Sequence, residues 1–233
     1  LELPSRCALQ SAEGFAQSAV QLLLAAGAQM LSFGSESADT GSLEQAAQLL
    51  CSPRFEPALR EGLQRGLSYA AARQQALCAL GGDGSLLSCP NDNLAVEYLK
   101  AARRLNWTPQ ILAIPRVGAG HDGGAHPEFP SASFLREEIL AGRLEAGNPA
   151  ALKYNERGIL TRLRAMDLPD FEALPDSGEG LARRLYQAAR RAVTLEEVYA
   201  QTKTKRYAHA RIRRLVLWAA LGLRAADRPS SPP

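Results

Sequence analysis

The 233-residue sequence predicts an α/β fold in which a parallel sheet is followed by a basic, helical domain. Two apolar segments, 28–34 and 109–117, have the length and composition of buried strands, and helical patterns separate them. Strands connected in this way lie parallel in a sheet that is covered on both faces. After about residue 150 the pattern is helical. We therefore expect a sheet domain over 1–150, a helical domain over 151–224 and a disordered, proline-rich tail over 225–233.

Each element has its own local signal. Helical periodicity runs from Ser11 to Ala26, and Gly27 follows as a stop. The first three residues have the composition of a strand end. The sequence Pro90–Asn93 is suited to capping the helix that follows it. Further helices are expected at 42–50, 53–64, 68–80, 94–105 and 131–144, and breaks in the helical domain at Pro169, Pro175 and Gly178–Gly180.

Charge is divided unevenly along the chain. Residues 1–180 contain 15 Lys or Arg and 21 Asp or Glu, whereas residues 181–214 contain 10 Lys or Arg and only 2 Asp or Glu. The densest stretch runs from Lys203 to Arg214. Positive charge gathered in this way is typical of a surface that binds a polyanion, either nucleic acid or an anionic membrane. A solvated helix face is the alternative for any single run of charge.

The four cysteines are widely spaced and form no CxxC pair, which predicts reduced, mostly buried thiols in a cytoplasmic protein. No apolar run reaches the roughly 18 to 20 residues of a membrane span, and the first residues lack the features of a signal peptide. His121 and His126 lie five residues apart without an evident third ligand, so we expect no metal site.

Ligands of open α/β sheets bind at the carboxyl ends of the strands, so the residues there are candidates for a binding site. Gly34 ends the first apolar segment, and Arg116 follows the second, ahead of a Gly-rich loop. Ser133 and Arg136 lie at a helix start, where hydroxyl, guanidinium and free N–H groups can bind an anion. Purely structural explanations are also open: Gly34 as a turn residue, Ser133 as a helix cap and Arg116 as half of an ion pair.

Six motifs occur in order along the chain: LELP at Leu1, FGSES at Phe33, PND at Pro90, IPRVGAGHD at Ile114, SASFLR at Ser131, and KTKRY with ARIRR from Lys203. In these motifs the sequence resembles the bacterial tRNA(Met) cytidine acetate ligase family, which is similar to Rossmann-like nucleotidyltransferases with a His-x-Gly-His motif. The resemblance implies an enzyme that makes acetyladenylate from ATP and acetate. It then transfers the acetyl group to N4 of the wobble cytidine of elongator tRNA(Met). Mg²⁺ is expected to accompany ATP.

The resemblance also implies roles for individual residues. Gly34, Asn91, Arg116 and Val117 would contact ATP, together with Ser133 and Arg136 from a second phosphate-binding signature. The residues expected to face tRNA are Lys203, Lys205, Arg206, Tyr207, Arg211 and Arg214. For Tyr207, stacking on an unpaired base and anchoring of the last helix in the core are both open. That helix has one apolar stripe, formed by Ile212, Leu215, Val216, Ala219 and Leu223, which leaves its other faces for phosphates.

Three departures from the family pattern matter. None of the three histidines lies in a His-x-Gly-His motif, which in the family precedes LELP. We therefore expect the chain to be a fragment that has an incomplete sheet and no catalytic residue, and that makes no acetyladenylate by itself. Ala208 stands where the family usually has Thr, and Ala38 where it often has Gly. A non-catalytic RNA-binding module of the same fold and a small-molecule adenylyltransferase are the alternatives. The sequence does not indicate the oligomeric state.

Overall fold

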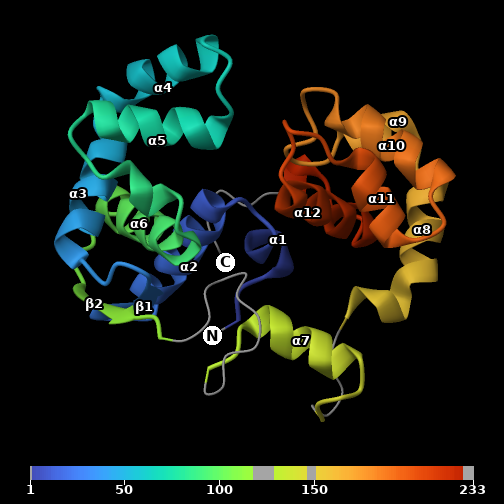
Figure 1. Cartoon of the computed structure of the whole chain (residues 1–233), viewed down its shortest axis with the longest axis horizontal. Coiled ribbons are helices and arrows are strands. Elements are labelled where there is room, and N and C mark those ends of the chain that lie inside the picture. Colours follow the sequence, from blue (N-terminus) through green and yellow to red (C-terminus); the bar gives the residue numbers. More distant parts are fainter. Residues whose placement is uncertain (1, 118–128, 146–150, 228–233) are drawn as a thin grey trace. The chain divides into compact units, whose positions relative to one another are not determined.

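The computed structural model describes residues 2–117, 129–145 and 151–227 (Figure 1). Contacts divide the chain into two compact units. The first, here called the helical unit, consists of residues 1–18 and 150–233, and the second, the sheet unit, of residues 19–149. The expected sheet domain had included residues 1–18. These residues group with the helical unit, where the Trp218 Nε1–H group donates a hydrogen bond of 3.0 Å to the Leu9 carbonyl oxygen.

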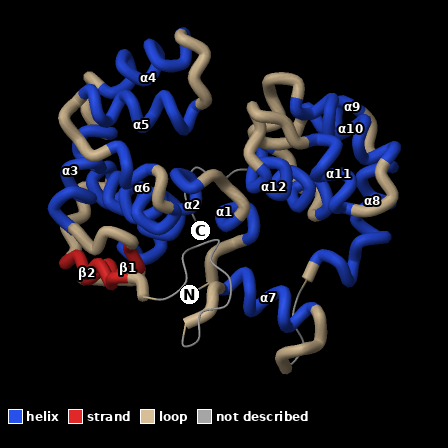
Figure 2. The backbone as a smooth tube through the Cα atoms, in the orientation of Figure 1, coloured by secondary structure: helices blue, strands red, loops and turns tan. Residues whose placement is uncertain are grey.

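The sheet unit contains two parallel strands, β1 (Met30–Ser35) and β2 (Gln110–Pro115), which lie side by side in Figure 2. Their register pairs Met30 with Gln110 and Ser35 with Pro115. The parallel order predicted from the sequence is thus confirmed. The helices of this unit are α2 (Ala12–Ala25, which begins in the helical unit), α3 (Thr40–Leu50), α4 (Phe55–Gln64), α5 (Tyr69–Ala79), η1 (Gly84–Leu87), α6 (Pro90–Arg104) and α7 (Ala132–Leu140).

Within the described residues the sheet is covered on one face only. Leu31 and Phe33 are buried in a core formed with α3, α5 and α6. By contrast, the side chains of Met30, Leu112 and Ile114 are about half exposed, at 45%, 48% and 52%. The prediction of two fully buried strands is therefore wrong for this part of the chain. Of residues 1–3, expected to end a strand, the two that the structure describes, Glu2 and Leu3, have no regular secondary structure, so the described sheet has only two strands.

The sequence Pro90–Asn93 is the first turn of α6 rather than a cap before it, and Cys89 is the N-cap residue. Proline is tolerated at the first helical position because that N–H group has no partner within the helix. The same argument explains Pro169, which lies in the first turn of α9 and does not interrupt it. Pro175 and Gly178 do lie between helices, as expected.

The helical unit packs its helices around one apolar core, whose largest fully buried side chains include Trp218 and Phe171. Ile212, Leu215, Val216 and Ala219 are buried and Leu223 is partly buried, which confirms the predicted stripe. The elements of this unit are α1 (Ser5–Ala8), η2 (Leu152–Asn155), α8 (Glu156–Ala165), α9 (Leu168–Glu172), α10 (Leu181–Arg191), α11 (Leu195–Thr202), α12 (His209–Ala220) and η3 (Ala225–Asp227).

All four cysteines are free, but only Cys7 is buried. Cys51 and Cys78 are exposed, so the prediction of mostly buried thiols is wrong. Within the described ranges, no helix combines the length and the apolar composition that crossing a membrane requires. The last six residues of the predicted tail lie outside the described residues.

Candidate functional site

The carboxyl ends of β1 and β2 bring Gly34 and Arg116 together. Gly34 pairs with Ile114 in the sheet, and the Arg116 N–H group donates to the Ser35 carbonyl oxygen at 3.0 Å. Gly34 lies within the strand, with no positive φ that would require glycine, so it is not a turn residue. A Cβ atom added there would lie 3.8 Å from the Arg116 Cγ atom. This is an ordinary van der Waals distance, so there is room over Gly34 on the exposed face of the sheet, in contact with the exposed Arg116 side chain.

Two carboxylates connect the end of β1 to the start of α6. The buried Asp92 side chain accepts hydrogen bonds from the Ser35 hydroxyl, from the Glu36 N–H group at 2.9 Å and from the Ser37 N–H group at 3.0 Å. In return, Glu36 accepts from the Asn91 side-chain amide at 2.6 Å and from the Asp92 N–H group at 2.8 Å. Each carboxylate thus binds the backbone of the other segment, and this exchange holds Asn91 against the residues that directly follow Gly34.

The surroundings of Glu36 also set its charge. Burial alone would raise the pKa of Glu36, but hydrogen bonds from the Asn91 side chain and from the Asp92 and Asn91 backbone outweigh it, so the pKa lies below its ordinary value. For Cys89, burial and then the negative charges of Asp92 and Glu36 raise the pKa of the thiol. We infer that Glu36 stays ionised and Cys89 stays protonated near neutral pH.

A buried ion group supports α6 from behind. The Glu97 carboxylate pairs with Arg73 of α5 and, at 2.8 Å, with Lys100 on its own helix. Arg73 also donates to the Asn93 side-chain oxygen at 2.8 Å. Two cations share one carboxylate in this group, and its bonds to Asn93 and Glu97 join α5 to the first turns of α6, where Asn91 and Asp92 lie.

The other residues predicted to contact ATP are not brought together by the described structure. Val117 is 72% exposed and is the last described residue before positions 118–128, which lie outside the described residues and include both histidines considered as metal ligands. Ser131, rather than Ser133, caps α7, since its side-chain oxygen accepts from the Phe134 N–H group. Ser133 lies in the first turn, where its hydroxyl accepts from Arg136 at 3.3 Å. That Ser133, Arg136 and Val117 contact the nucleotide stays a prediction.

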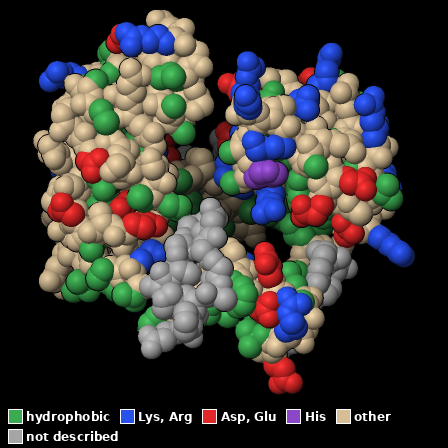
Figure 3. All heavy atoms as spheres, in the orientation of Figure 1, with side chains coloured by type: hydrophobic (Ala, Val, Ile, Leu, Met, Phe, Trp, Pro, Cys, Tyr) green, Lys and Arg blue, Asp and Glu red, His purple; other side chains and the backbone are tan. Residues whose placement is uncertain are grey.

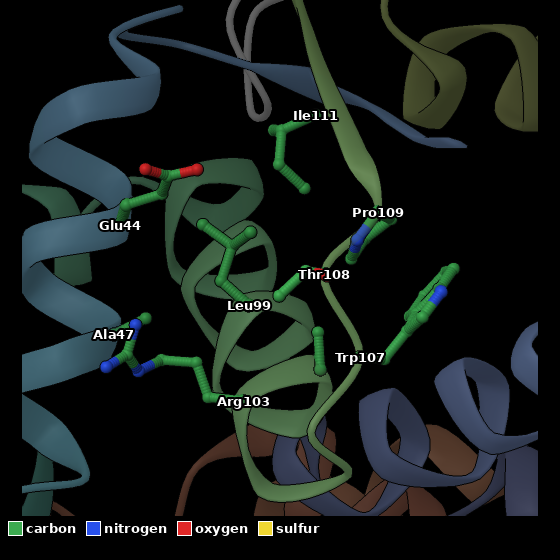
Figure 4. A pocket seen from close by; sticks show the side chains of 9 residues that line it. Glu44, Ala47, Leu99, Arg103, Trp107, Thr108, Pro109 and Ile111 are labelled. Carbon is green, nitrogen blue, oxygen red and sulfur yellow. The ribbon is translucent and has the colours of Figure 1, made fainter. Parts of the chain in front are cut away.

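A separate pocket of about 180 Å³ lies at the opposite end of β2 (Figure 4). Trp107, Pro109 and Ile111 line it from the start of the strand. Glu44 of α3 and Arg103 of α6 contribute its charged groups. Because ligands of parallel α/β sheets bind at the carboxyl ends, this pocket is not the candidate nucleotide site.

In the helical unit, the predicted tRNA-facing residues lie in the turn between α11 and α12 and on α12. Figure 3 shows Lys and Arg side chains over this unit. Lys205 and Arg206 are exposed, whereas Lys203 is half-buried and donates to the Thr204 carbonyl oxygen at 2.5 Å. Arg214 is also half-buried. Lys205 and Arg206 are therefore the members of the cluster best placed to meet a ligand.

Two residues of the cluster, Tyr207 and Arg211, make contacts with other parts of the helical unit. Tyr207 is only 5% exposed, packs in the core of the unit, and donates its hydroxyl proton to the Glu179 carbonyl oxygen at 2.5 Å. A ring held there cannot stack on a base without leaving the core, which favours the role of an anchor for the segment before α12. That Tyr207 contacts tRNA stays a prediction. Arg211 donates to the Asp176 carbonyl oxygen at 2.9 Å and pairs with Glu179 at 3.2 Å.

The sequence motifs contained residues whose roles were not foreseen. Glu36 of FGSES and Asp92 of PND position the strand end and the helix start, whereas the sequence pattern predicts only a capping role for Asp92. The signal available in the sequence is an acidic residue in each motif, one directly after a strand and one in the first turn of a helix. Each carboxylate binds the backbone of a segment more than fifty residues away, so no local sequence pattern indicates these bonds.

Comparisons with known proteins agree with the motifs. A family model described as HIGH nucleotidyl transferase matches residues 1–231. The chain is 33% identical over 240 residues to the tRNA(Met) cytidine acetate ligase of Fervidobacterium nodosum, covering 92% of this chain and 56% of that protein. It is 34% identical over 255 residues to the ligase of the same name from Listeria monocytogenes, covering 100% of this chain and 65% of that protein.

Solved structures give the same result. The apo crystal structure of Thermotoga maritima TmcAL matches with a TM-score of 0.84 and 29% identity, over 97% of this chain and 61% of that one. The structure of the same protein bound with alpha-thio ATP matches with a TM-score of 0.79 and 29% identity, over 97% and 60%. The chain thus spans about three fifths of the length of these relatives. The resemblance seen in the motifs is confirmed, and the chain belongs to the HIGH nucleotidyl transferase family, with tRNA(Met) cytidine acetate ligases among its relatives.

Proposed function

We propose that this chain provides the strand-end part of an ATP site and an RNA-binding surface in an ATP-dependent ligase. The ligase activates acetate as acetyladenylate and acetylates N4 of the wobble cytidine of elongator tRNA(Met). The observation that carries the proposal is the gathering of Gly34, Asn91 and Arg116 at the carboxyl ends of two parallel strands. A structure similar to this chain, that of Thermotoga maritima TmcAL, has been solved with alpha-thio ATP bound. A cytoplasmic location is part of the proposal.

Each of the three residues offers a distinct group to a nucleotide. The space left by Gly34 admits a flat base or a ribose against the backbone of β1. The Arg116 guanidinium is exposed beside it and can pair with a phosphate. One N–H group of the Asn91 side-chain amide donates to Glu36, so its second N–H group can donate to the ligand and its oxygen can accept from it.

Mg²⁺ would enter the site as a companion of ATP. The carboxylate oxygens nearest the strand ends, on Glu36 and Asp92, already accept hydrogen bonds from the protein. The described residues hold no group of three or more His, Cys, Asp or Glu side chains that could bind a metal ion. Because their oxygens are occupied by these hydrogen bonds, the two carboxylates do not fit a Mg²⁺ site, and their role is to hold the backbone of the strand end and the helix start.

The reaction is tested in the organism that carries the gene. Disrupting the gene should remove N4-acetylcytidine from the wobble position of elongator tRNA(Met), measured by mass spectrometry of the purified tRNA, and a plasmid copy should restore it. Persistence of the modification in the disrupted strain would favour a non-catalytic RNA-binding module or a small-molecule adenylyltransferase.

The nucleotide site is tested on the chain itself. Arg116→Ala should weaken ATP binding, measured by calorimetry, by about tenfold or more, because a charge-assisted hydrogen bond to phosphate is lost. Arg54→Ala is the matched control, since Arg54 precedes α4 and its replacement removes the same charge elsewhere in the sheet unit. Equal ATP affinities of the two variants would contradict the assignment of Arg116.

A further inference from the structure

A hollow of about 410 Å³ in the helical unit is lined by cations and amides. Its walls come from α10 and the end of α11, and it lies outside the cluster at Lys203–Arg214 that the motifs indicated. The lining side chains are Arg184, Gln187, Ala188, Arg191 and Gln201. Two guanidinium groups and two amides supply hydrogen-bond donors, and no carboxylate is among the lining residues. Such a lining suits an anion.

Arg184 is held in place by the end of the neighbouring helix. Its Nε–H group donates to the Thr202 carbonyl oxygen at 3.2 Å, and its Nη2 group donates to the Gln201 carbonyl oxygen at 2.9 Å. These carbonyls belong to the last turn of α11, where the helix dipole favours a positive charge. A guanidinium group has five N–H donors, so donors remain for a ligand after these two bonds. The protein thereby positions the cation before any ligand arrives.

Arg191 completes the site from the same side of α10. Residues 184, 187, 188 and 191 have the spacing of one helix face, beside the buried stripe that includes Leu181 and Leu185. Among the described residues Arg191 has no ion pair, and its side chain is exposed. Its neighbour Arg190 differs, because it donates to the Met166 carbonyl oxygen at 2.9 Å and lies over the Tyr186 ring. Arg191 is therefore available to a ligand whereas Arg190 serves the fold.

We propose that this hollow binds a backbone phosphate of the RNA substrate, as a second contact beyond Lys205 and Arg206. The inference rests on the proposed function, because it assumes that the helical unit binds RNA. Gln201, at the edge of the hollow, lies four and five residues before the exposed Lys205 and Arg206, so the hollow and these cations are close together along the chain. Guanidinium groups pair with phosphate oxygens through two parallel hydrogen bonds, and side-chain amides add neutral donors. The contact is to phosphate, so it does not depend on the base sequence.

The test measures binding of fluorescently labelled elongator tRNA(Met) to the chain over a salt series. Arg191→Ala should weaken binding about five- to tenfold near 0.1 M salt and lower the slope of log K against log salt by about one. Gln187→Glu places a carboxylate in the hollow with little change in shape, and should weaken binding at least as much. Arg183→Ala is the matched control: it removes the same charge from an exposed position on α10 that does not line the hollow.

The outcomes separate this inference from the proposed function. If the unaltered chain binds tRNA and the Arg191→Ala and Gln187→Glu variants bind equally well, the inference fails and the proposed function stands. If Arg183→Ala has the same effect as Arg191→Ala, the effect is one of net charge and the hollow is not a site. If the unaltered chain binds no RNA, both fail. ATP affinity should be unchanged in Arg191→Ala, and a loss of ATP rather than RNA binding would identify the anion as a nucleotide and overturn the proposal.

Discussion

Replacing Asp92 by Ala should destabilise the sheet unit more than any replacement of a surface carboxylate. Asp92 is 1% exposed, and its two oxygens accept from the Ser35 hydroxyl and from the N–H groups of Glu36 and Ser37. With alanine in its place, the end of β1 loses the bonds to the residue-92 carboxylate, and its connection to the first turn of α6 depends on the bonds that Glu36 accepts from Asn91 and from the residue-92 N–H group. The Ser35 hydroxyl is also buried. In the variant its remaining partners lie on its own segment, where the Ser37 hydroxyl is 3.3 Å away.

The magnitude follows from the number and type of hydrogen bonds. A hydrogen bond to a charged group contributes about 1.5 to 3 kcal/mol, and bonds that share one acceptor are not additive. Part of the loss is offset, because the variant no longer buries a charge near Glu36 and water can enter the space. We expect the free energy of unfolding to fall by about 2 to 4 kcal/mol. With a urea dependence of about 2 kcal/mol per molar, the midpoint should drop by about 1 to 2 M.

The assay uses the fact that the chain has two tryptophans, one in each unit. Trp107 packs against the core of the sheet unit and Trp218 lies in the core of the helical unit. In a Trp218→Phe background, fluorescence therefore reports unfolding of the sheet unit alone, and circular dichroism checks that the background is folded. Asp39→Ala is the control, because Asp39 is an exposed carboxylate that caps α3 through the Ser42 N–H group. A midpoint change in Asp92→Ala no larger than in Asp39→Ala would refute the reasoning.

Four further predictions concern single residues. Ala208, the N-cap residue of α12, has the extended backbone of a cap but no capping side chain, so Ala208→Thr should stabilise the helical unit by about 0.5 to 2 kcal/mol, measured by the Trp218 signal in urea. Ala38 has φ +52°, a conformation that costs alanine about 1 to 2 kcal/mol and glycine less, so Ala38→Gly should raise the melting temperature and a lower one would contradict the strain. Folding lowers the pKa of Glu36 below its ordinary value of 4.5. The ionised Glu36 side chain therefore stabilises the folded protein above pH 4.5, and this stabilisation is lost as the pH falls through the lower pKa of the folded state. Glu36→Gln should remove this contribution to the pH dependence of stability. Tyr207→Phe should cost about 1 kcal/mol through the lost bond to Glu179 and leave the tRNA affinity of the folded protein unchanged, whereas a selective loss of affinity would return the ring to the RNA surface.

Local patterns in the sequence predicted both described strands and most helices of the sheet unit in their order. The helical stretch ending before Gly27 became α2, and Gly27 has φ +76°, the left-handed conformation that ends helices. Ser68 caps α5 with its side chain, and the apolar stripe of α12 faces the core. These features depend on residues a few positions apart, where periodicity and capping chemistry act directly. The family was recognisable for a related reason, since its motifs are short and keep their order.

Contacts between distant segments were decided only by the tertiary structure. The sequence contains Glu36 and Asp92 as two ordinary acidic residues, and only folding places each carboxylate on the backbone of the other segment. Tyr207 stands among cations in the sequence but lies in the core, because the turn after α11 directs its ring inward and the Glu179 carbonyl satisfies its hydroxyl. The hollow between Arg184 and Arg191 likewise exists only once α10 packs against the end of α11. Charge and composition specify what a side chain can bind, but which partner it meets depends on the packing of elements that are far apart in the chain.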